Sequence, residues 1–160
     1  LDERQLIQDE NIRFAVIGRR DGIPADVLAE MDANVRLSER NTGLTLCLAI
    51  NYGGRTELVD ACRALAERVR SGELSPEQID DDAISGALYT AGMPDPDLLI
   101  RTAGEMRISN YLLWQVSYAE LWVTPTCWPD FDAGLFHDAL KDFARRNRKF
   151  GGLSDAPGSP

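Results

Sequence analysis

Apolar residues along this chain fall into two kinds of pattern, which predict strands and helices in alternation. Residues 12–18 are a candidate strand, and residues 44–51 are almost continuously apolar, as strands covered on both faces of a parallel sheet tend to be. Residues 98–100 form a shorter apolar run after two prolines, and they predict a buried strand that ends near Arg101. The last strand candidate is residues 121–124.

Between these runs, apolar residues recur at helical spacing. This spacing predicts helices over residues 24–40, over about 58–69 and over about 131–143. Residues 75–78, Ser-Pro-Glu-Gln, combine a capping residue, a proline and a glutamine in the order of a helix start. Strands that alternate with helices predict an α/β fold, a Rossmann-like parallel sheet with helices on both faces.

Polar residues follow the predicted strand at residues 98–100. Arg101 falls at its carboxyl end, where open α/β sheets bind ligands, and Arg107 follows after a turn at a glycine. Ser109 and Asn110 are capping residues for a helix predicted over residues 111–118. Two guanidiniums, a hydroxyl and a helix N-terminus in one loop indicate an anion site, and guanidinium forks suit diphosphate oxygens.

The alternative is that both arginines form ion pairs with nearby acids. Glu105, Glu120 and the aspartates at positions 95 and 97 are all close in sequence. In a chain with net charge −9, this pairing is the favoured interpretation for any single arginine. For the whole group of arginines, serine and helix start, the anion site is favoured.

Composition limits the other functions. At 160 residues with 44% hydrophobic content, the chain suits one domain, predicted here over residues 1–152 with a disordered tail at 153–160. The net charge of −9 argues against nucleic-acid binding, which needs a broad basic surface. No apolar run of membrane-spanning length occurs. Three scattered cysteines without metal-binding spacing fit reduced core cysteines in a cytoplasmic protein.

Three motifs occur in one order along the chain. They are Asn-Tyr-Gly-Gly-Arg at residues 51–55, the segment DLLIRTAGEMRISNYLLWQVSYAE at residues 97–120, and Trp-Pro-Asp-Phe at residues 128–131. With these motifs, residues 12–152 resemble the cis-prenyltransferases, the undecaprenyl diphosphate synthase family. The resemblance implies a transferase that condenses isopentenyl diphosphate with an allylic diphosphate, depends on Mg²⁺ and makes a cis-polyprenyl diphosphate, such as a cell wall lipid carrier.

The resemblance also implies roles for individual residues. Arg101, Arg107 and Ser109 match the residues that bind the diphosphate of isopentenyl diphosphate, and Glu120 matches a glutamate that assists the Mg²⁺ site. Asn51 and Arg55 are expected to belong to the active-site structure. Lys149 and Gly151 match an Arg-X-Gly element that reaches the isopentenyl diphosphate of the neighbouring subunit in a homodimer. Lysine in place of arginine keeps the charge but loses the bidentate fork.

One motif of the family is missing from the 160 residues. The Asp-Gly-Asn-Gly-Arg-Trp loop, whose aspartate binds Mg²⁺ and which holds the allylic diphosphate, does not occur. The chain resembles the C-terminal part of a synthase, so we assign no catalytic residue within it and expect it to be inactive alone. The alternative is a non-catalytic partner subunit of a heteromeric enzyme. The presence of all four diphosphate- and metal-site residues counts against this alternative. Membrane contact is expected only at the periphery, through the lipid product.

Overall fold

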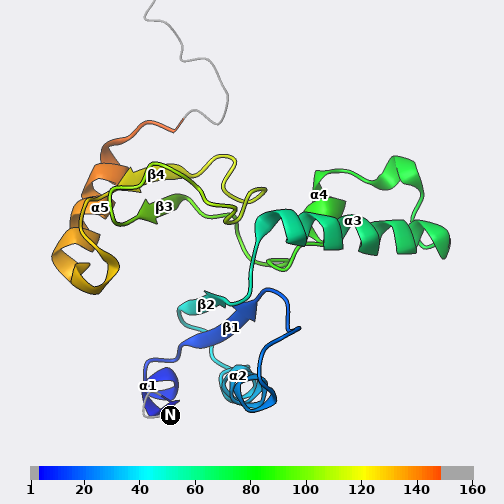
Figure 1. Cartoon of the computed structure of the whole chain (residues 1–160), viewed down its shortest axis with the longest axis horizontal. Coiled ribbons are helices and arrows are strands. Elements are labelled where there is room, and N and C mark those ends of the chain that lie inside the picture. Colours follow the sequence, from blue (N-terminus) through cyan, green and yellow to red (C-terminus); the bar gives the residue numbers. More distant parts are fainter. Residues whose placement is uncertain (1–3, 149–160) are drawn as a thin grey trace, which may run out of the picture. The chain divides into compact units, whose positions relative to one another are not determined.

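The structure is a computed structural model and describes residues 4–148 (Figure 1). The chain divides into two compact units at the bond between Met93 and Pro94. Each unit contains one pair of parallel strands with helices packed beside it. The predicted α/β class with parallel strands is therefore confirmed. The single domain over residues 1–152 stays a prediction, and the tail at 153–160 lies outside the described residues.

The first unit begins with two helices and two strands, α1 (Arg4–Asp9), β1 (Arg13–Ile17), α2 (Ala25–Leu37) and β2 (Thr45–Ala49). Strands β1 and β2 pair in parallel, with Arg13 opposite Thr45. Helix α2 packs on β1. Both strands and α2 fall where the apolar pattern predicts them.

Ser38 connects the end of α2 to β1. Its side chain is fully buried, donates a hydrogen bond to the carbonyl of Asn34 at 3.0 Å, and accepts one from the backbone N–H of Phe14 at 2.8 Å. The hydroxyl thus forms hydrogen bonds with a backbone group of the helix and with a backbone group of the strand. The helix ends here, three residues before the predicted stop at Asn41.

The rest of the first unit is α3 (Gly54–Arg70), the 3-10 turn η1 (Pro76–Gln78) and the short helix α4 (Asp81–Ser85). Helix α3 contacts α4 and buries one stripe at helical spacing, made of Gly54, Glu57, Ala61 and Leu65. The helix start predicted at residues 75–78 is a single 3-10 turn, closed by a 2.8 Å bond from the Ser75 N–H to the Gln78 side chain.

The second unit contains β3 (Leu98–Arg101), β4 (Glu120–Val123), the 3-10 turn η2 (Trp128–Asp130) and α5 (Ala133–Arg145). Strands β3 and β4 pair in parallel, and α5 contacts β4 (Figure 1). The side chain of Asp132 caps α5 by accepting a bond from the Leu135 N–H at 2.9 Å.

The helix predicted over residues 111–118 is not formed. The structure has bends and turns in this segment instead. Ser109, Asn110 and Leu112 have left-handed backbone angles, with φ of 52°, 62° and 46°. A right-handed helix needs φ near −60° at each residue, so it cannot start through these positions. The predicted anion site therefore has no helix N-terminus here.

Two expectations about burial are also wrong. Strand β2 is not covered on both faces, because Leu46 and Leu48 on one face remain 42% and 39% exposed. Cys62 and Cys127 are exposed rather than in the core, and Cys47 is half-buried. A continuous apolar run thus identified the strand correctly but not the covering of each face.

Candidate functional site

Arg101 is the last residue of β3, and the loop that follows it is fixed to the chain beyond β4. The N–H groups of Ala103 and Gly104 donate to the carbonyls of Thr126 and Thr124, both at 2.8 Å. Both loop residues have left-handed backbone angles, which reverse the chain directly after the strand. The turn places Glu105 and Arg107 beside Arg101.

The Glu105 carboxylate lies between the guanidiniums of Arg101 and Arg107, which we call the arginine pair. Its Oε2 accepts from Nη2 of Arg101, and its Oε1 accepts from Nη2 of Arg107. The Arg101 hydrogen bond, with the positive charge of Arg107, lowers the pKa of Glu105 below its ordinary value, although partial desolvation opposes the shift. Glu105 is thus a carboxylate anion at neutral pH.

This arrangement satisfies both interpretations of the sequence. The arginines do pair with an acid, and in doing so they converge on one anion. In addition, Nε of Arg101 is buried and has no hydrogen-bond partner among the residues that the structure describes. Both guanidiniums thus donate to one small volume, which the Glu105 carboxylate occupies.

Ser109 lies in the same loop as the arginine pair and is exposed. Its left-handed backbone comes from the turn at Ser109 and Asn110. The loop from Glu105 to Asn110 contains no helix or strand, so Ser109 is held less firmly than Arg101. Three of the predicted diphosphate ligands therefore belong to one strand end and its loop.

Glu120 is not part of this group. It is the first residue of β4 and pairs with Leu98, whereas Arg101 pairs with Val123. Three residues of strand separate the two side chains, roughly 10 Å along the strand at about 3.3 Å per residue. The structure thus places Glu120 at the amino end of the strand pair and the arginine pair at its carboxyl end.

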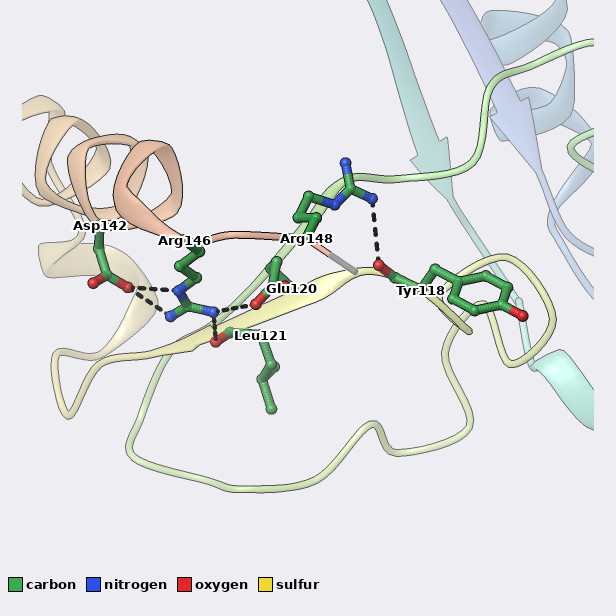
Figure 2. A network of polar contacts seen from close by, with 6 residues as sticks. All are labelled: Tyr118, Glu120, Leu121, Asp142, Arg146 and Arg148. Carbon is green, nitrogen blue, oxygen red and sulfur yellow. Dashed lines mark hydrogen bonds and ion pairs between the residues drawn. The ribbon is translucent and has the colours of Figure 1, made fainter. Parts of the chain in front are cut away.

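Figure 2 shows what Glu120 contacts instead. Arg146, just beyond α5, donates to Oε2 of Glu120 at 2.8 Å and to the Leu121 carbonyl at 3.0 Å, and it forms an ion pair with Asp142 at 2.6 Å. The hydrogen bonds to Glu120 and then to Asp142 raise the pKa of Arg146 above its ordinary value.

Arg148 is the second arginine that holds the chain beyond α5. It forms an ion pair with Asp97 and donates to the Tyr118 carbonyl at 3.3 Å. Together, Arg146 and Arg148 fasten this segment along β4 (Figure 2). The predicted phosphate contacts Lys149 and Gly151 follow immediately but lie outside the described residues.

A Mg²⁺ ion would find one candidate ligand here. Arg146 binds Oε2 of Glu120. No group of three or more His, Cys, Asp or Glu side chains within residues 4–148 is arranged to bind a metal. Glu120 fits the role of a single carboxylate ligand, with the remaining positions filled by substrate phosphate and water, as Mg²⁺ commonly binds.

In the first unit, Asn51 joins the loops that follow β1 and β2. Its side-chain amide donates to the carbonyls of Arg19 and Asp21 at 3.1 and 2.9 Å, and its own carbonyl accepts from the Arg19 N–H at 3.2 Å. Asn51 itself has φ of 49°, which asparagine tolerates better than most residues. Its contacts in the described chain are structural, and Arg55 lies exposed in the first turn of α3.

Sequence reasoning missed a second polar group in this unit. Arg19 binds Asp60 of α3 through both carboxylate oxygens, at 2.6 and 2.9 Å, and the Tyr89 hydroxyl donates to the same carboxylate. Glu57, only 1% exposed, accepts from the Tyr52 hydroxyl and from the Tyr89 N–H. The position of an arginine directly after the apolar run at residues 12–18 could have indicated this polar group. The other members of the group, however, lie about 40 and 70 residues further along the chain by simple counting.

Replacement of Asp60 by asparagine is expected to lower stability at neutral pH and to matter less in acid. The Arg19 hydrogen bonds, with that of Tyr89, hold the pKa of Asp60 well below its usual range. A depressed carboxyl pKa contributes stability above the unfolded value of about 3.9 and loses it as the pH falls toward the folded value. Urea unfolding of Asp60→Asn and wild type from pH 7 to pH 3 measures this, with the exposed-residue variant Asp138→Asn as control. An equal loss at every pH would contradict the charge-based explanation.

The parallel strands define an α/β protein in which two arginines converge on one carboxylate at the end of a strand. A family model described as putative undecaprenyl diphosphate synthase matches residues 1–151. An isoprenyl transferase of Rhodopirellula baltica is 52% identical over 154 residues, and one of Porphyromonas gingivalis is 46% identical over 155 residues. The chain belongs to the undecaprenyl diphosphate synthase family of prenyltransferases.

The matches cover almost all of this chain but only part of the relatives. They include 96% and 97% of the chain, against 63% and 61% of the two transferases. Lavandulyl diphosphate synthase from Lavandula x intermedia, solved with dimethylallyl diphosphate, has a TM-score of 0.90 and 38% identity, covering 94% of this chain and 65% of that one. A probable undecaprenyl diphosphate synthase from Campylobacter jejuni has a TM-score of 0.80 and 29% identity, covering 94% and 68%.

Proposed function

We propose that this chain carries the isopentenyl diphosphate half of a cis-prenyltransferase active site. The arginine pair, which already holds one anion in the form of the Glu105 carboxylate, is the observation that supports the proposal most strongly. Guanidinium forks at a strand's carboxyl end suit the two phosphate groups of the substrate. Ser109 adds a hydroxyl from the same loop.

In the reaction of the complete enzyme, the alkene of isopentenyl diphosphate attacks the allylic carbon of the second substrate as diphosphate leaves. Arg101 and Arg107 would hold the diphosphate of the nucleophile and so fix its alkene in position, which is an orientation effect. Mg²⁺, when bound, would stabilise negative charge on the diphosphates, with Glu120 as one ligand. Asn51 would keep the loops after β1 and β2 together, close to Arg55.

Lys149 and Gly151 are proposed to add a phosphate contact to the neighbouring subunit of a homodimer. The supporting observation is that Arg146 and Arg148 hold the segment directly before Lys149 in place. A cytoplasmic location with peripheral membrane contact through the lipid product fits the proposal. No helix among residues 4–148 has both the length and the apolar character required to cross a membrane.

The 160-residue chain is expected to bind isopentenyl diphosphate but not to elongate an allylic primer. The sequence has the residues proposed for the first substrate and no Asp-Gly-Asn-Gly-Arg-Trp motif for the second. The test is calorimetric titration of isopentenyl diphosphate with Mg²⁺, beside incorporation of radiolabelled isopentenyl diphosphate into polyprenyl products. Saturable binding without product supports the half-site. Product formation would contradict it, and a folded chain that binds nothing would favour the partner-subunit alternative.

A further inference from the structure

We propose that Glu105 is an internal competitor for the diphosphate of the substrate and thereby sets the affinity of the arginine pair. Its carboxylate uses the same guanidinium donors that a bound diphosphate would need. Substrate binding then exchanges one anion for another rather than filling an open cationic site. This inference rests on the function proposed above for Arg101 and Arg107.

The contacts of the carboxylate carry the argument. Each oxygen of Glu105 accepts from a different guanidinium, Oε2 from Arg101 and Oε1 from Arg107. A carboxylate that bridges two guanidiniums neutralises half of their charge. An anion that is to use the two N–H groups now bonded to Glu105 must displace the carboxylate from them, because each N–H donates along one direction.

The surrounding structure allows this exchange. Arg101 is held by β3, and the turn at Ala103 and Gly104 is fixed by two backbone bonds to the chain after β4. Beyond Gly104 the loop is exposed, with Met106 at 76% and the side chain of Arg107 at 61%. Glu105 therefore has room to swing outward from this exposed loop while Arg101 keeps its position in β3.

Energetics favour a diphosphate over the carboxylate. The Arg101–Glu105 pair is half-buried and the Arg107 side chain is exposed, and ion pairs in contact with solvent are individually weak, so the two bonds of Glu105 can be replaced. A diphosphate carries more charge and more acceptor oxygens than one carboxylate and makes several charge-assisted hydrogen bonds to two guanidiniums. Displacement of the carboxylate costs free energy, and this cost lowers the affinity of the arginine pair for diphosphate. Removal of the carboxylate is therefore expected to tighten diphosphate binding.

The test is titration of inorganic diphosphate into the 160-residue chain, at fixed ionic strength and without divalent metal. Glu105→Gln keeps the shape of the side chain and removes its charge, and we expect the Kd to fall about tenfold, the size of two weak ion pairs together. Asp138→Asn, an equal charge change on α5, should leave the Kd within about twofold of wild type. Glu105→Asp, which is too short to bridge both arginines but keeps the charge, should give a smaller tightening.

The outcomes separate this inference from the proposed function. If wild type binds diphosphate and Glu105→Gln binds equally or more weakly, Glu105 is not a competitor, and the diphosphate site stands without it. If neither protein binds while both unfold cooperatively, the arginine pair is not a diphosphate site and both proposals fail. Binding by Glu105→Gln alone would be the strongest support, since only the competing carboxylate would then have masked the site.

Discussion

Isopentenyl diphosphate binding is expected to weaken at least about 100-fold when Arg101 and Arg107 are both replaced by alanine. Each guanidinium would make charge-assisted hydrogen bonds to phosphate oxygens, and such bonds are worth about 1.5–3 kcal/mol each. Two arginines together therefore account for about 3–6 kcal/mol, which is a loss of more than two orders of magnitude. Calorimetric titration with Mg²⁺ present measures the change directly.

The matched control is the double variant Arg68→Ala, Arg70→Ala. These two arginines lie near the end of α3 and are paired with Glu73 and Glu67 on an exposed surface. Their removal lowers the net charge by the same two units but should change the Kd by less than about threefold at 0.15 M salt, because long-range charge effects are screened. Similar losses in both variants would show that general charge, not the arginine pair, attracts the substrate.

The position of Arg101 could be predicted because it depends on local pattern alone. An apolar run after two prolines predicts a short buried strand, and the first charged residue marks its end; the structure confirms the strand and its end at Arg101, but its four residues are half-buried rather than buried. The prediction of a helix after Ser109 was wrong for a specific reason. Serine and asparagine are favoured both as helix caps and in turns, asparagine also in left-handed conformations, so the same two residues are compatible with either outcome.

The distance between Glu120 and the arginine pair could have been predicted from the sequence. Arg101 ends one strand and Glu120 precedes the next strand candidate at residues 121–124. In parallel strands, a residue at the start and a residue at the end lie at opposite edges of the sheet. Family resemblance assigned the two residues to one substrate and its metal, whereas strand direction alone separates them.

Neither the apolar pattern nor the family resemblance could predict contacts between segments that are far apart in the sequence. Arg19 binds Asp60, which also accepts from Tyr89, and Arg146 binds Glu120. The sequence separation is 41 residues for Arg19 and Asp60 and 26 for Arg146 and Glu120. Periodicity predicts which elements form, but it gives no information on which charged residues meet after folding. Glu105 was one of four acids considered as partners of the arginines, and only the folded loop selects it for both.

Replacement of Gly18 by alanine is expected to destabilise the first unit strongly, by about 3–5 kcal/mol. Gly18 follows β1 with φ of 114°, and a Cβ atom there would lie 2.0 Å from the carbonyl oxygen of Ile50. Neither group can move easily, because the Ile50 N–H donates to the Ile17 carbonyl at 2.9 Å and both belong to the backbone that joins the strand ends. Chemical denaturation followed by circular dichroism measures the free energy of unfolding.

Gly22→Ala separates the steric clash from the cost of the backbone angle. Gly22 has φ of 77°, and its added Cβ would meet nothing within 4 Å, so only the conformational cost of about 1–2 kcal/mol applies. The difference between the two variants combines the free energy needed to part the carboxyl ends of β1 and β2 with the larger backbone cost of alanine at the φ of Gly18. Because Asn51 bonds across that junction to the Arg19 and Asp21 carbonyls, the Gly18 variant should also displace Asn51. Equal destabilisation by both substitutions would show that the strand ends open without cost and that Asn51 is not held by this close contact.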